Sequence, residues 1–148
     1  MSLTRSKTSF VRKRNPPPTD HPEFFLDRGL GKRVAERLAE AGWTVHPMFK
    51  VFPRSDNRRI EDVTWIPKVT QWGWIILAKD SFQLRHERRM ITQCGARVFS
   101  LPNANMKSDQ MVERFLLNRD RIVEHAVNGG PCHYSVSHDR LRPIDLLQ

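Results

Sequence analysis

Three aspartates stand where apolar segments end or where a helix should begin. Asp27 closes EFFLD, Asp62 lies within IEDVTWI, and Asp80 closes WIILAKD. Acids at the carboxyl ends of neighbouring parallel strands converge on one crevice. Carboxylates gathered there repel one another unless a hard cation neutralises them. The set therefore predicts a shared divalent-cation site, although each aspartate alone would be an ordinary helix cap or turn former.

The overall charge of the chain points to a polyanionic partner. The 148 residues carry a net charge of +9, and the isoelectric point is near 10.4. Such a balance favours binding to nucleic acid and says nothing about the fold. An acidic crevice within a basic surface is typical of metal-assisted cleavage of a nucleic acid.

The length of the chain suits one domain with a short extension at each end. Residues 1–22 contain five basic side chains and one acid, so we expect a disordered basic extension, with an RNA-contacting arm or a targeting peptide as alternatives. We expect the domain at 23–138 and a C-terminal tail at 139–148. Cys94 and Cys132 form no metal or redox motif, and the longest apolar run, Trp74–Ala78, is too short to cross a membrane. These features predict a cytoplasmic protein with reduced thiols.

Apolar runs and helical periodicity alternate along the domain. Buried or half-buried runs predict strands at 23–27, 43–46, 74–77, 96–101 and 132–136. Helical spacing predicts helices at 32–41, 84–93 and 109–127, and another from Asp62 to Val69 that Pro67 should kink or delay. We expect residues 47–59 to form a loop. This alternation predicts an α/β fold, doubly wound around a mostly parallel sheet.

Other chemistries find less support in the sequence. Gly29-Leu30-Gly31-Lys32 lacks the spacing of a phosphate loop, the six histidines form no zinc motif, and no nucleophile elbow is present. Trp65, Trp72 and Trp74 fall within ten residues. We expect burial against the sheet for this group, with stacking on nucleic-acid bases as the alternative.

At this point the chain resembles the PIN-like ribonucleases, in particular a compact subgroup related to VapC-type toxins. The resemblance runs from about Glu23 to Val136. It rests on an ordered series of segments: FFLDRGLG (24–31), AGWTVH (41–46), EDVTWI (61–66), GWIILAKD (73–80) and GGPCHYSV (129–136). It implies a Rossmann-like three-layer α/β/α fold and an acidic crevice that binds Mg²⁺ or Mn²⁺ and hydrolyses RNA phosphodiester bonds.

The resemblance assigns the three aspartates as catalytic metal ligands. Asp27 matches the acid after the first strand, Asp62 the acid that opens the middle helix, and Asp80 the acid of a TKD-like motif, which reads AKD here. Glu61 is a further candidate that could substitute for or assist Asp62. The family pattern has a fourth acid after the next strand, where this chain reads SLPNANMKSD, so Asn103, Asn105 or Asp109 would have to serve there.

Basic residues near these acids are candidates for holding the RNA. Arg28, Lys32 and Lys79 would clamp the phosphate. Arg85 and Arg88 would position the rest of the strand, or would simply form a solvated helix face.

The resemblance also implies partners. It suggests the toxin of a toxin–antitoxin pair, with RNA as substrate and a small acidic antitoxin that blocks the crevice; a homodimer remains open. Two alternatives stay beside this reading. One is a non-catalytic PIN-like module that binds RNA or protein, and the other is a DNA-directed nuclease on the same scaffold, which the 2′-hydroxyl of RNA would distinguish.

Overall fold

The computed structural model describes residues 21–53, 60–79, 82, 84–102 and 105–146. Within these ranges a six-stranded sheet forms the centre of the molecule, in the order β2-β1-β3-β4-β5-β6. Its strands are β1 (Glu23–Leu26), β2 (Thr44–Pro47), β3 (Ile75–Ala78), β4 (Arg97–Ser100), β5 (Cys132–Val136) and β6 (Leu141–Pro143). All neighbouring pairs are parallel except β5 and β6. The expected mostly parallel α/β sheet is confirmed.

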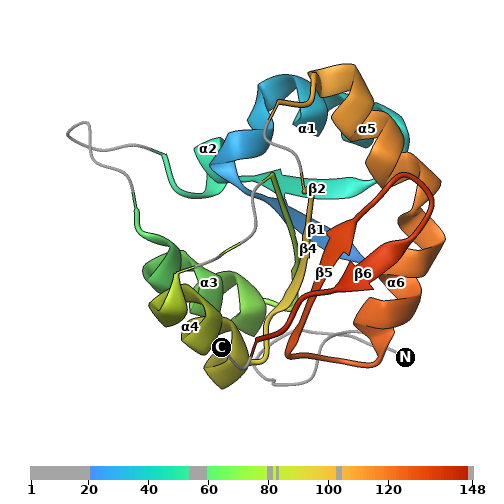
Figure 1. The fold of residues 1–148 in the computed structure, drawn as a ribbon. Coiled ribbons are helices and arrows are strands. Elements are labelled where there is room, and N and C mark those ends of the chain that lie inside the picture. The colour runs from blue at the N-terminus through green and yellow to red at the C-terminus, as the bar shows by residue number, and fades with distance from the viewer. Residues whose placement is uncertain (1–20, 54–59, 80–81, 83, 103–104, 147–148) are drawn as a thin grey trace, which may run out of the picture.

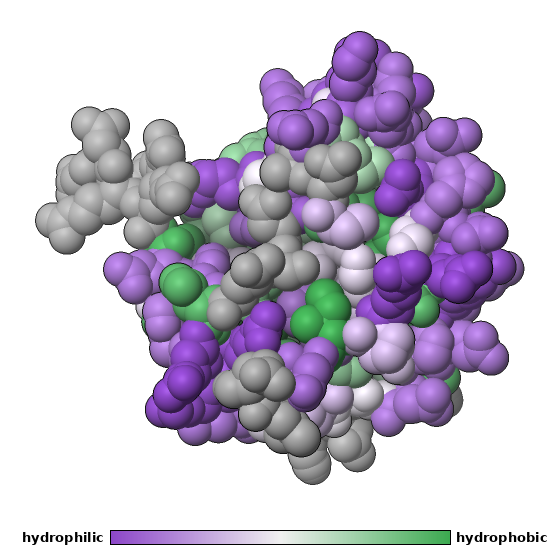
Figure 2. All heavy atoms as spheres, viewed as in Figure 1, coloured by the Kyte–Doolittle hydropathy of each residue, from purple (hydrophilic) through white to green (hydrophobic). Residues whose placement is uncertain are grey.

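Helices cover both faces of the sheet, which gives three layers (Figure 1). The helical elements are η2 (Arg28–Leu30), α1 (Gly31–Glu40), α2 (Met48–Val51), α3 (Asp62–Gln71), α4 (Arg85–Cys94), α5 (Ser108–Leu117) and α6 (Arg119–Val127). Helices α1, α5 and α6 pack on one face, and α3 and α4 pack on the other (Figure 1). Polar residues cover most of the face seen in Figure 2, with separate apolar patches between them.

The strands divide the core into two apolar clusters because successive side chains point to opposite faces. Phe24 and Leu26 of β1 belong to the cluster under α1, α5 and α6, whereas Phe25 belongs to the cluster under α3 and α4. All four residues of β3 are buried, as a strand covered on both faces requires. This double burial explains why the strand-forming runs show no polar alternation.

Two helical segments differ from the sequence prediction. The helix expected at 109–127 is divided into α5 and α6, and Asn118 lies at the break. The buried Asn118 amide donates hydrogen bonds to the carbonyl oxygens of Arg114 (2.8 Å) and Ser137 (2.9 Å), so it ties the break to the chain after β5. Pro67 lies inside α3 and does not delay its start.

The two ends of the sheet also hold more structure than we expected. The short helix α2 occupies part of the expected loop at 47–59. Strand β6 lies within the expected C-terminal tail and pairs with β5, so β5 is an interior strand. Strand β6 gives almost no sequence signal, because it has only three residues and contains Pro143. A proline is tolerated there because β6 is an edge strand. No helix within the described ranges is long and apolar enough to cross a membrane.

Candidate active site

The carboxyl ends of the central strands carry the first predicted acid. Asp27 directly follows β1, and its backbone N–H donates to the carbonyl oxygen of Leu77 in β3 (2.9 Å). Its carboxylate accepts a hydrogen bond from the backbone N–H of Arg28 (2.7 Å) and so caps η2. Lys79 follows β3 at the same edge of the sheet, because β1 and β3 are parallel neighbours.

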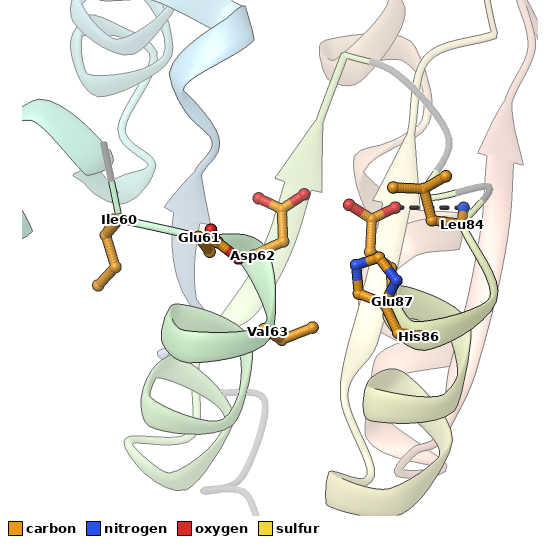
Figure 3. Close-up of a pocket in the computed structure, with 7 residues that line it drawn as sticks. All are labelled: Ile60, Glu61, Asp62, Val63, Leu84, His86 and Glu87. Carbon is orange, nitrogen blue, oxygen red and sulfur yellow. Dashed lines mark hydrogen bonds between the residues drawn. The ribbon is translucent and has the colours of Figure 1, made fainter. Parts of the chain in front are cut away.

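A pocket of about 340 Å³ opens between the first turns of α3 and α4. It is lined by Ile60, Glu61, Asp62, Val63, Leu84, His86 and Glu87. Figure 3 shows the carboxylates of Asp62 and Glu87 pointing toward each other across the space between the two helices. The structure therefore opposes two acids from separate helices in one pocket.

Both carboxylates are oriented by contacts within their own helices. Asp62 accepts a hydrogen bond from the indole N–H of Trp65 (2.9 Å), one turn further along α3. Trp65 is completely buried, so this bond fixes the acid against a rigid part of the core. Glu87 is the third residue of α4 and accepts from the backbone N–H of Leu84 (3.3 Å), as an acid in the first turn of a helix does.

The surroundings of Glu87 disfavour its ionised form. Burial is the largest cause, followed by the hydrogen bond to Asp62 and by the negative charge of Asp62. The charge of Asp27 adds to these effects, whereas the Leu84 backbone bond opposes them, and together they raise the pKa of Glu87 to about 7. Near neutral pH, ionisation of Glu87 in this pocket is therefore energetically unfavourable.

The structure brings some of the predicted acids together and separates others. Glu61 lines the same pocket as Asp62, and Asp27 is close enough to act electrostatically on it. Asp109 lies in α5, where its exposed carboxylate pairs with Arg37 (3.2 Å) and Arg33 (3.6 Å) of α1. Asp80 lies outside the described residues. Among those described, no group of three or more His, Cys, Asp or Glu side chains has an arrangement that could hold a metal ion.

The predicted phosphate-binding residues also divide into two groups. Arg28 and Lys79 lie beside the acidic edge, and within the described ranges the Nη2 atom of Arg28 is buried without a hydrogen-bond partner. Arg88 is half-buried and donates to the carbonyl oxygen of Phe82 (3.1 Å), while Arg85 is exposed. Lys32 lines a different pocket, between α1 and β2.

Glu87 lines the acidic pocket and was not among the residues that the sequence analysis predicted. It lies among Arg85, Arg88 and Arg89, and that stretch reads as a basic helix face. One signal could have found it. An acid in the first turn of the helix that follows the third parallel strand faces the same crevice as the acid that opens the preceding helix.

Comparison with known proteins agrees with this fold. A family model described as "PIN like domain" matches residues 22–103, which is more than half of the chain. The chain belongs to this PIN-like family. A protein of Mycobacterium tuberculosis (strain ATCC 25618 / H37Rv) named "Putative ribonuclease VapC45" is 31% identical over 120 residues, which cover 79% of this chain and 87% of that protein. The search of solved structures gave no match. The expected relationship to VapC-type PIN proteins is therefore confirmed.

Proposed function

We propose that this chain is a metal-dependent endoribonuclease of the PIN-like type, and that it acts as the toxin of a toxin–antitoxin pair. The observation that carries the proposal is the opposed Asp62–Glu87 pair, with Asp27 acting on it, at the carboxyl edge of a parallel sheet. Perturbed acids in a pocket are typical of a functional site. The similarity to a protein named as a ribonuclease supports RNA as the substrate.

The chemistry of the donor set fits a hard divalent cation. Mg²⁺ and Mn²⁺ prefer carboxylate oxygens, and the pocket presents such oxygens with their negative charges opposed. Asp27 and Asp62 would hold the ion together with Asp80, which follows β3 in the sequence. Glu87, which faces Asp62, would add negative charge beside it. When bound, such an ion supplies Lewis acidity toward the phosphodiester and its attacking water.

The other side chains of the site would position the RNA. Arg28 directly follows Asp27, its Nη2 atom is buried without a hydrogen-bond partner among the described residues, and a guanidinium suits the bidentate geometry of a phosphate. Lys79 adds a second positive charge at the same edge. The Trp65–Asp62 hydrogen bond keeps one carboxylate in place during turnover.

Cleavage of a mixed single-stranded and structured RNA pool tests this function. The assay compares Mg²⁺, Mn²⁺ and EDTA for the wild-type chain, for Asp27→Asn, and for Asp120→Asn, which removes an exposed acid of α6. We expect metal-dependent cutting that Asp27→Asn lowers by orders of magnitude and Asp120→Asn leaves unchanged. A loss of less than about tenfold for Asp27→Asn, or 1.4 kcal/mol of barrier, would contradict the assignment.

The same assay separates the alternative functions. RNA that is bound without being cut in any metal would indicate a non-catalytic PIN-like module. Preferential cutting of a DNA strand of matched sequence would indicate a DNA-directed nuclease, because only RNA offers the 2′-hydroxyl.

The antitoxin partner requires its own test. We propose a small acidic protein, since the chain carries a net charge of +9. Expression of the chain alone should arrest growth, and co-expression of the product of the adjacent gene should relieve that arrest and inhibit the purified nuclease. Growth arrest that the Asp27→Asn variant also causes would contradict a toxin based on cleavage.

A further inference from the structure

Trp72 is an exposed aromatic side chain, whereas most other large rings among the described residues are covered. It caps the carboxyl end of α3 and is 47% exposed, whereas Trp65 of the same helix is completely buried. Half-exposed tryptophans are costly to leave in water and are enriched at binding surfaces. The position of Trp72 therefore calls for an explanation beyond packing.

A set of stacked rings holds Trp72 in a fixed orientation. Its indole stacks on Phe52 (ring centroids 6.0 Å apart, planes at 17°) and meets the edge of Trp74 (5.1 Å, 61°). Trp74 in turn stacks on His46 at 3.7 Å, with the two planes only 5° apart. His46 is anchored to Glu23 through a 2.7 Å contact between its Nε2 atom and the carboxylate. A ring that is already ordered loses little entropy when a flat ligand stacks on it.

The helix that carries Trp72 also carries the acidic pocket. Asp62 is the first residue of α3, and Trp72 directly follows its last residue. At 1.5 Å per residue the two side chains start about 15 Å apart along the helix axis. Thr64, Lys68 and Trp72 are exposed and follow one another at a spacing of four, so they form one surface stripe. Glu61, which also lines the pocket, precedes Thr64 by three residues on this face of α3, so Lys68 places a cation between Glu61 and the aromatic ring.

We propose that Trp72 is a base-stacking subsite for single-stranded RNA whose scissile bond lies at the Asp62–Glu87 pocket, with Lys68 contacting the backbone between them. This inference rests on the proposed function and names how its substrate is held. An aromatic face with a neighbouring cation is the recurring arrangement for sequence-tolerant binding of single strands. The net charge of +9 favours RNA, a polyanion, over a peptide with few acidic residues as the molecule that binds here.

RNA binding in EDTA tests the subsite without depending on cleavage. The affinity for a labelled single-stranded RNA is measured for the wild type, Trp72→Ala, Trp72→Phe and Leu117→Ala, the last of which truncates an exposed apolar side chain of α5. Loss of base stacking should weaken binding roughly tenfold to a hundredfold in Trp72→Ala. Trp72→Phe should retain most of the affinity, and Leu117→Ala should bind as the wild type does.

Tryptophan fluorescence reports on the same contact directly. RNA should quench the wild-type emission, and the part of the quenching that disappears in Trp72→Phe belongs to Trp72. Circular dichroism verifies that each variant is folded. Unchanged affinity in folded Trp72→Ala, or quenching that persists in Trp72→Phe, would overturn the subsite and would assign the ring to another kind of surface.

Cleavage kinetics then separate this inference from the proposed function. For a long substrate, Trp72→Ala should raise KM with kcat nearly unchanged, while cleavage of a substrate too short to span about 15 Å should be unaffected. A wild-type chain that binds RNA through Trp72 and cuts nothing would contradict the nuclease and leave the subsite standing. A chain that cuts normally after Trp72→Ala would contradict the subsite alone.

Discussion

The α3–α4 pocket and the α1–α5 surface both contain acidic side chains, but the charges around those side chains are opposite in sign. In the pocket, Asp62 and Glu87 face each other, and the pKa of Glu87 rises to about 7, chiefly because of its burial. On the α1–α5 surface, the exposed carboxylate of Asp109 lies between Arg33 and Arg37. Acids that stabilise a fold are placed beside cations, whereas acids that serve a ligand are left opposed until the ligand arrives. This difference is the reason for placing the proposed site in the α3–α4 pocket.

Removing Glu87 should break the pocket most completely. Glu87→Gln keeps the shape of the side chain and its acceptor for the Leu84 N–H, but removes the charge. We expect RNA cleavage to fall by about a hundredfold, or 2.7 kcal/mol of barrier. The matched control is Glu113→Gln, an exposed acid of α5, which should cut at the wild-type rate. Equal activities in the two variants would remove Glu87 from the site.

Divalent cations should stabilise the folded protein by binding at the α3–α4 pocket and not at the α1–α5 surface. Mg²⁺ at a hundredfold excess over its Kd would add about 2.7 kcal/mol to the free energy of unfolding, which corresponds to several degrees of Tm. The thermal shift should vanish in Asp62→Asn and persist in Asp109→Asn. A shift of the same size in both variants would place the cation elsewhere.

His133 is a buried histidine in the core between the sheet and α4, and its ionisation should also affect stability. His133 is 2% exposed, and burial, followed by the charge of Arg88, lowers its pKa to about 4. The unfolded chain takes up this proton near pH 6.5, but the folded chain does so only near pH 4. Stability should therefore fall as the pH decreases from about 6.5 to 4, by at most about 1.4 kcal/mol per pH unit.

Chemical denaturation at several pH values measures this slope. His133→Gln should flatten it, and His138→Gln, which changes an exposed histidine, should not. An unchanged slope in folded His133→Gln would show that the buried imidazole is not the group that titrates.

Removing one charge from each region should change the free energy of unfolding of the protein in opposite directions. Without metal, Glu87→Gln relieves the repulsion with Asp62, so the free energy of unfolding should rise slightly at pH 8. Asp109→Asn removes two exposed ion pairs and should lower it by at most about 1 kcal/mol. Urea titrations of the two variants against the wild type provide the comparison. Losses of equal size would mean that the pocket is no more strained than the surface.

Much of the fold was predictable because its strands are buried on both faces. The apolar runs around β1, β3 and β4 and the helical spacing of α1 placed these elements to within a residue or two. The break between α5 and α6 was not predictable, since it depends on hydrogen bonds from Asn118 to Ser137 and His138, which are remote in sequence. Tertiary contacts of this kind override local helical propensity.

The candidate site was only partly predictable for a related reason. Asp27 and Asp62 follow from the rule that strand ends and helix starts converge on one edge of a parallel sheet. Glu87 did not follow, because its role depends on the close packing of α4 against α3, and its neighbours in sequence are arginines. Trp72 was expected to be covered together with Trp65, but Trp65 is completely buried and Trp72 is 47% exposed.

The most direct test of the opposed-acid pocket is the rate of RNA cleavage in Mg²⁺ by Asp62→Asn and Asp109→Asn, measured side by side with the wild type. Each variant removes one carboxylate charge and keeps the shape of the side chain. The account predicts a loss of two or more orders of magnitude for Asp62→Asn and less than a threefold change for Asp109→Asn. Comparable rates for the two variants, with both proteins folded, would contradict it.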